Sequence, residues 1–153
     1  MANQRLIDNL NRALSLELAA VIQYMQHSFL VTGPERELFR SYFRKQSEES
    51  HDHAETLGDK IVALGGLPTV EPSTIRQATD LTEMLRQDLV MEREAMEAYM
   101  AAWESCEDAE RPTRFLLEER IYREQEHIDE LEKLTNERKA NVTQDKITLR
   151  QVG

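Results

Sequence analysis

The chain has 153 residues, of which 40% are apolar and 31% are charged, a balance that fits one folded domain with an apolar core. Its 29 acidic residues outnumber 19 basic ones, and the net charge of −10 disfavours binding to nucleic acid and favours attraction of small cations. A lone Cys106 excludes an intramolecular disulfide, and with a polar N-terminus and no long apolar run it predicts a cytoplasmic protein that contacts no membrane.

Glycine and proline are scarce, with 5 and 4 copies, and apolar residues recur at helical spacing, so we predict an all-α fold. The first predicted helix covers residues 4–31 and ends at Gly33 and Pro34. Its apolar stripe includes one acid, because Glu17 lies seven residues from both Leu10 and Tyr24.

The second predicted helix covers residues 34–64 and places His53 on one stripe with Phe43, Gln46 and Leu57. It ends at two consecutive glycines. The stretch that follows, G-G-L-P-T-V-E-P-S-T, contains two prolines and no helical period. We therefore predict a long connection there and no further core element.

The third predicted helix begins at residue 73 or 80 and extends to residue 108, with Glu92 seven residues from Tyr99 on its inner line. The fourth follows E-R-P-T and carries an inner stripe that includes Phe115, Glu124 and His127. The bundle is thus expected to occupy residues 1–135. Residues 136–153 are expected to form a C-terminal tail or a short fifth helix.

Connection lengths predict the topology. Short turns join the first helix to the second and the third to the fourth, so each pair should be antiparallel neighbours. The long connection between the second and third helices lets the chain travel the length of the bundle before it re-enters. This predicts a ferritin-like antiparallel four-helix bundle with one long crossover.

Each predicted helix brings an acid or a histidine to its apolar stripe. A single inward glutamate usually pairs with an arginine, and a single buried histidine is usually a hydrogen-bonded core residue. No Arg or Lys is expected on these stripes, so several buried carboxylates together predict a compensating metal ion. Carboxylate and imidazole ligands suit iron in either oxidation state, and manganese or zinc less selectively. The candidate residues are Glu17, His53, Glu92, Glu124 and His127.

The chain resembles the bacterioferritin branch of the ferritin-like family over nearly its whole length. The stretches that carry the resemblance are L-E-L-A-A-V-I-Q-Y, H-A-E-T-L-G-D-K-I-V-A-L-G-G-L-P, E-M-L-R-Q-D-L-V-M-E and E-Q-E-H-I-D-E-L. The resemblance implies a non-haem di-iron centre. In that centre Glu17 and Glu92 would be terminal ligands, His53 and His127 would each bind one metal, and Glu124 would bridge them. Tyr24 would be a hydrogen-bonding or redox-active neighbour, or an ordinary core tyrosine.

Two positions depart from the family pattern. Ser50 stands where the pattern has a second bridging glutamate. Glu49, four residues before His53, is the predicted substitute ligand, and Glu48 is the weaker candidate. His51 stands where bacterioferritins have a methionine that ligates a haem shared between subunits. A histidine can also ligate haem iron, so a haem and a plain surface or interface histidine both stay open.

These features predict a ferroxidase that oxidises ferrous iron with dioxygen or peroxide, for iron storage or detoxification. Two alternatives stay open: a rubrerythrin-like di-iron peroxidase or oxidase, and a cage subunit with a degraded metal centre, which Ser50 favours. The outward faces of the first two helices form a mixed polar and aromatic surface that predicts a homo-oligomer, at least a dimer, and its residues include Arg36, Phe39, Arg40, Arg44 and His51. The resemblance further implies a hollow cage. A DNA-binding miniature ferritin is disfavoured, because the ligand set here is contained in one chain.

Overall fold

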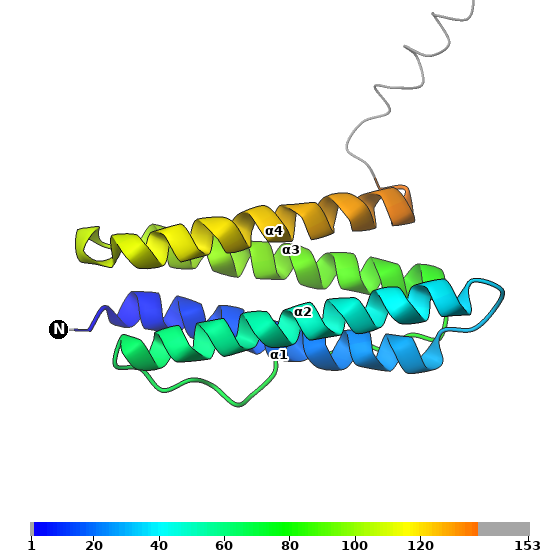
Figure 1. Cartoon of the computed structure of the whole chain (residues 1–153), viewed down its shortest axis with the longest axis horizontal. Coiled ribbons are helices and arrows are strands. Elements are labelled where there is room, and N and C mark those ends of the chain that lie inside the picture. Colours follow the sequence, from blue (N-terminus) through cyan, green and yellow to red (C-terminus); the bar gives the residue numbers. More distant parts are fainter. Residues whose placement is uncertain (1, 138–153) are drawn as a thin grey trace, which may run out of the picture.

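The computed structural model describes residues 2–137, and in that range the chain forms four long α-helices and one short 3-10 helix, with no strand (Figure 1). The elements are α1 (Gln4–Leu30), α2 (Arg36–Ala63), α3 (Leu81–Ser105), η1 (Asp108–Glu110) and α4 (Arg111–Thr135). The predicted all-α four-helix bundle is confirmed, and α3 begins at the later of its two predicted starts. Most of the tail predicted for residues 136–153 lies outside the described residues.

Local sequence explains where the helices begin and end. The side chains of Asn3 and Asp80 each accept a hydrogen bond of 3.1 Å from the backbone N–H three residues further on, which caps α1 and α3. Pro112 lies in the first turn of α4, where a missing N–H is tolerated. Gly33 and Gly65 follow α1 and α2 with φ of +98° and +86°, a backbone conformation that favours glycine.

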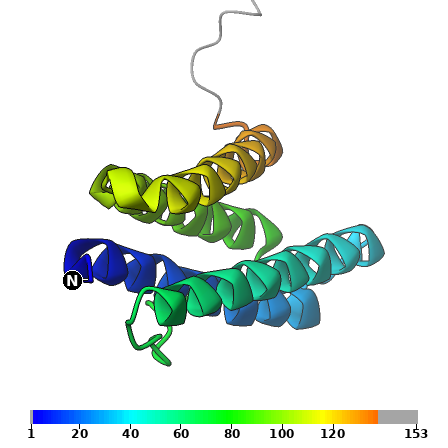
Figure 2. The same ribbon diagram turned by 60° about the vertical axis from the view of Figure 1, so that its left-hand side comes forward.

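The four helices form two antiparallel pairs, α1 with α2 and α3 with α4 (Figures 1 and 2). α1 also packs against α3, whereas among the described residues the backbones of α2 and α4 do not approach as closely. The crossover, residues 64–80, returns along α1. Its path is fixed by hydrogen bonds from Ser73 N–H to Ser15 O at 2.8 Å and from Arg76 N–H to Gln23 Oε1 at 2.9 Å. α3 therefore starts at the end of the bundle where α1 stops.

The apolar core consists of two clusters. One includes Leu6, Leu10, Leu14, Leu57, Ile61 and Leu117, and the other includes Tyr24, Phe43, Met84, Leu89, Ile128 and Leu131. Along α1 and α4, the acids and histidines predicted to face inward lie between the residues of the two clusters. A charge in this position is shielded from water on both sides, which makes its burial costly.

One residue of the predicted inner stripe of α4 faces outward instead. Phe115 is 65% exposed, whereas Leu117 and Leu131 are fully buried. Phe115 is nine residues from Glu124, and nine steps of 100° place it half a turn away from that residue's face. Among the described residues, no helix is both long enough and apolar enough to cross a membrane.

Candidate metal centre

The five acids and histidines from the predicted stripes meet near the middle of the bundle. They come from all four long helices: Glu17 from α1, His53 from α2, Glu92 from α3, and Glu124 and His127 from α4. The three glutamates and His53 are at most 5% exposed, and the side chain of His127 is 14% exposed. Helical periodicity alone therefore places these groups inside, at the point where the two apolar clusters meet.

Their possible ligand atoms form two groups that share one residue. In the first group, one atom from each of Glu17, His53 and Glu124 lies within 4.8 Å of the others. Glu92, Glu124 and His127 form the second group by the same measure. The rings of His53 and His127 lie nearly parallel, with centroids 6.5 Å apart and 17° between their planes. One carboxylate, that of Glu124, can thus contact two neighbouring cations.

Each of the other two carboxylates accepts a hydrogen bond from a buried tyrosine on the facing helix. The Tyr24 hydroxyl donates to Glu92 Oε1 at 2.5 Å, and the Tyr99 hydroxyl donates to Glu17 Oε1 at 2.6 Å. Burial first, and then the adjacent carboxylate, raises the pKa of both phenols, so both stay protonated as donors. Tyr99 was expected only as a core residue, although its seven-residue distance from Glu92 repeats that of Tyr24 from Glu17.

Burial dominates the electrostatics of Glu124. Desolvation raises its pKa well above the usual range, and the nearby carboxylates of Glu92 and Glu17 raise it further. Glu124 Oε2 and His127 Nδ1 are both buried without a hydrogen-bond partner. Buried acceptors without partners are costly. A cation at this place would satisfy both atoms, so the residues present fit a bound metal ion.

The expectation that the stripes carry no basic residue is wrong for α4. Arg120 lies one turn before Glu124, and its guanidinium lowers the pKa of that carboxyl, although desolvation keeps the pKa raised on balance. Its long side chain reaches inward from a partly exposed position, as arginine side chains commonly do. One cation beside three buried carboxylates still leaves an excess of negative charge.

Glu49 does not occupy the place predicted for the second bridging ligand. Ser50 is buried and brings no carboxylate, and no atom of Glu49 belongs to either ligand group. Glu49 Oε2 instead lies 2.9 Å from His127 Nε2, and its Oε1 lies 3.8 Å from Arg123. Because an ionised carboxylate only accepts, the ring proton belongs on Nε2, and Nδ1 keeps a free lone pair 3.9 Å from Glu92 Oε1. Glu49 therefore orients the His127 ring through Nε2 and leaves Nδ1 available to a metal ion.

His51 lies away from the centre. Its side chain is 61% exposed, and Nδ1 is 3.9 Å from Asp52 and 3.5 Å from Glu55. These three exposed residues form a further group of possible ligand atoms. Such groups are common on acidic surfaces without an ion, and no haem ligand role follows from this one.

A separate buried polar cluster lies one turn from Glu92 along α3. The fully buried carboxylate of Asp88 accepts a hydrogen bond from Gln23 Nε2 at 2.9 Å and lies 3.1 Å from His27 Nδ1. Burial raises the pKa of Asp88, although the hydrogen bond from His27 acts in the opposite direction. Nε2 of the same histidine is buried without a partner.

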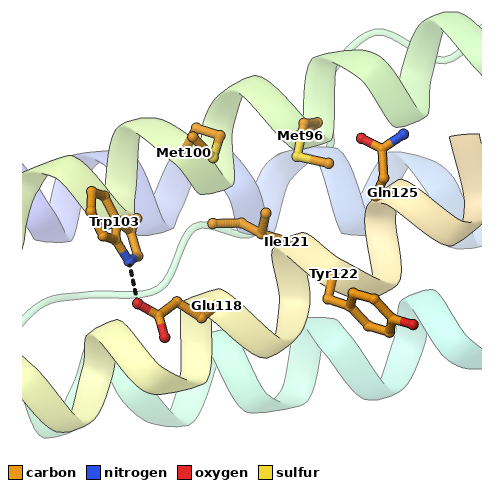
Figure 3. Close-up of a pocket in the computed structure, with 7 residues that line it drawn as sticks. All are labelled: Met96, Met100, Trp103, Glu118, Ile121, Tyr122 and Gln125. Atoms are coloured by element: carbon orange, nitrogen blue, oxygen red, sulfur yellow. Dashed lines mark hydrogen bonds between the residues drawn. The ribbon is translucent and has the colours of Figure 1, made fainter.

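An apolar groove of about 630 Å³ lies between α3 and α4 and has no part in the centre (Figure 3). Its lining residues are Met96, Met100, Trp103, Glu118, Ile121, Tyr122 and Gln125. Trp103 Nε1 donates a hydrogen bond of 3.0 Å to Glu118 at one end of it. None of these residues belongs to the ligand groups, so the groove is not the metal site.

Known proteins share the fold of this chain and part of its sequence. The family profile of the ferritin-like domain matches residues 7–140. The chain is 32% identical over 130 residues to a bacterioferritin of Brucella melitensis biotype 1, covering 84% of this chain and 81% of the relative. A ferritin-like, diiron-carboxylate protein from Bacillus anthracis has a similar structure, with a TM-score of 0.83, 31% identity and coverage of 87% of this chain and 96% of that one. Rhodobacter capsulatus bacterioferritin, solved with a metal-free dinuclear site and haem iron, gives a TM-score of 0.78, 28% identity and coverage of 87% and 84%.

Proposed function

Because this chain belongs to the ferritin-like family and is an iron-binding protein of the bacterioferritin type, we propose that it oxidises ferrous iron at the centre described above. The observation that carries the proposal is the pair of ligand groups that share Glu124. Each group offers two carboxylates and one imidazole. This mixed oxygen and nitrogen set suits iron in both oxidation states.

Two ferrous ions are the substrate in this proposal. Each loses one electron, and dioxygen takes up the two electrons together with two protons to give hydrogen peroxide. The role of the protein is to collect anionic ligands in a water-poor interior. Anionic ligands stabilise the ferric product more than the ferrous ion, because Coulomb attraction grows with the charge of the ion. The low dielectric of the protein interior makes this attraction stronger than it would be in water.

The test is an anaerobic ferrous titration of the metal-free protein followed by exposure to air, with metals per chain and ferric absorbance recorded. We expect two ions per chain and rapid ferric formation in the wild type. Glu124→Ala should abolish the rapid phase while the helical circular dichroism stays intact, because it removes the carboxylate common to both groups. Glu119→Ala, on the exposed face of the same helix, is the matched control. Oxidation at the wild-type rate in Glu124→Ala would sink the proposal.

We further propose that the oxidation serves iron storage or detoxification in a homo-oligomer, which the bacterioferritin relatives support. Ser50 favours one competing reading, a cage subunit with a degraded centre, because α2 brings no carboxylate into either group. The titration separates the two: one weakly held ion per chain and slow oxidation would favour the degraded centre. Sustained consumption of peroxide without accumulation of ferric mineral would favour a di-iron peroxidase.

A further inference from the structure

One half of the centre joins α1, α2 and α3. Tyr99 of α3 donates its hydroxyl hydrogen bond to Glu17 Oε1 at 2.6 Å. His53 Nδ1 from α2 lies 3.2 Å from the same oxygen. All three residues are at most 5% exposed, so solvent provides no substitute for either contact. The Glu17 carboxylate is therefore oriented by a phenol on one side and faces an imidazole on the other.

The other half repeats this geometry with α1 and α3 exchanged. Tyr24 donates to Glu92 Oε1 at 2.5 Å, and His127 Nδ1 lies 3.9 Å from that oxygen. In both helices the acid precedes the tyrosine by seven residues, as in Glu17 with Tyr24 and Glu92 with Tyr99. Because α1 and α3 run antiparallel, each tyrosine reaches the acid of the opposite helix. α1 and α3 therefore exchange roles between the two halves.

We propose that Tyr99 is a positioning residue for the metal ion of the Glu17 and His53 half, the counterpart of Tyr24 in the Glu92 and His127 half. The inference rests on the proposed function, since the oriented carboxylates are the proposed ligands. A hydrogen bond to a buried ligand carboxylate fixes its rotamer before the metal arrives, and loss of such outer contacts typically costs about 10-fold to 100-fold in metal affinity. Each tyrosine should therefore influence its own half and leave the other unaffected.

Cobalt(II) is the probe, because it binds such ligands, absorbs in the visible range and avoids turnover with dioxygen. His127→Ala leaves only the Glu17 and His53 half intact, and His53→Ala leaves only the other. We expect Tyr99→Phe to weaken cobalt binding about 10-fold or more in the His127→Ala background and to leave affinity in the His53→Ala background unchanged. Tyr24→Phe should give the reverse pattern. In otherwise wild-type protein, Tyr99→Phe should weaken one of two binding steps and alter its visible band.

Phenylalanine keeps the ring in place, so thermal unfolding should show that each variant folds. Tyr122→Phe is the control for the loss of a hydroxyl, because Tyr122 is 68% exposed. Equal effects of Tyr99→Phe in both halves, or none in either, would overturn the positioning role while leaving the metal centre standing. Failure of the wild type to bind cobalt at all would overturn the metal centre itself, and with it this inference.

Discussion

Glu49 and Ser50 decide how many carboxylates the centre receives from α2. Ser50 occupies the place that is three residues before His53, the spacing that Glu124 has to His127 on α4. Glu49 is turned toward the outer nitrogen of His127. Side chains in this outer position set the tautomer and orientation of a ligating histidine without touching the metal.

Substitutions at these two positions should therefore act differently. Glu49→Ala should weaken the ion bound by His127 about 10-fold, and Glu49→Gln should do so less, because the amide oxygen can still accept the hydrogen bond from Nε2. Ser50→Glu should tighten the second ion or leave it unchanged, because it adds a carboxylate on the inner face. Metal titrations of the three variants measure this. Loss of one whole ion per chain in both Glu49 variants would mean that Glu49 is a direct ligand, as its four-residue spacing from His53 predicts.

Asp88 should make the stability of the metal-free protein depend on pH. Its folded pKa is raised by burial, above the unfolded value of about 3.9. In the window between the two values the native state binds more protons, so the free energy of unfolding falls as pH rises through it and then levels off. Asp88→Asn should show a smaller fall, because Glu124, whose pKa is raised as well, still contributes. Asp129→Asn, on the exposed side of α4, controls for loss of a charge. Denaturant unfolding at a series of pH values measures the slope; parallel curves for Asp88→Asn and wild type would contradict the prediction.

Helical periodicity predicts the burial of residues such as Glu17 and Glu124, because their burial depends only on their position on the apolar stripe of one helix. Tyr99 lay on a predicted stripe too, but its hydroxyl gains a partner only from the register of α1 against α3. The contacts of Arg120 and Glu49 are hard to predict for a related reason. Both have long side chains that choose among several neighbours, and that choice depends on tertiary packing that a single sequence does not display.

At the scale of elements, helix ends followed from local chemistry. The sequence marks the ends of α1 and α2 by Gly33 and Gly65, and the start of α3 by the cap residue Asp80. α3 begins at the later of its two predicted starts, where Asp80 caps it. The residues before it bind α1 instead, through the backbone N–H groups of Ser73 and Arg76. Phe115 shows that an error of two residues along a helix, about half a turn, places an outward residue on the inner stripe.

Two glycines near the end of α2 should respond to alanine with opposite signs. Gly58 lies inside the helix, and a Cβ there meets nothing within 4 Å, so Gly58→Ala should stabilise the protein by about 0.5–1 kcal/mol. At Gly66 a Cβ would lie 2.6 Å from Ile7 Cγ2 and 2.9 Å from Ile61 Cγ2. Overpacking of this kind costs about 1–3 kcal/mol. Equilibrium unfolding in urea gives both values, and destabilisation by Gly58→Ala or none by Gly66→Ala would contradict this view of the α2 end.

At the scale of the whole molecule, the centre lies where the two helix pairs face one another. The backbones of α2 and α4 do not approach closely, and side chains such as Glu49 and His127 make the contact across this space. A cation held by His53 and Glu124 would join the same two helices. A bound metal ion would therefore also hold the two helix pairs together. The apolar stripes of single helices do not predict this link, because it depends on how the pairs pack against each other.

Assembly depends on surfaces that the isolated chain leaves exposed. On α1, Ile22, Met25 and Phe29 are 40%, 41% and 59% exposed and share one stripe at helical spacing. With Ile75 of the crossover they border a hollow of about 410 Å³. Phe39 of α2 is partly buried and packs against Tyr42 and Phe43 of the same helix. An apolar stripe bordered by polar residues suits a twofold contact between copies of the chain.

We therefore expect the metal-free protein to be at least a dimer, held together through the α1 stripe. Phe29→Asp should convert it to a folded monomer, because it places a charge on the most exposed side chain of that contact. Phe115→Asp, the same substitution on the exposed side of α4, should leave the twofold pair intact. Light scattering coupled to gel filtration measures both. A wild-type protein that is a stable monomer would contradict the dimer and the cage together, whereas a dimer that never grows further would preserve the proposed oxidation and remove the proposed storage.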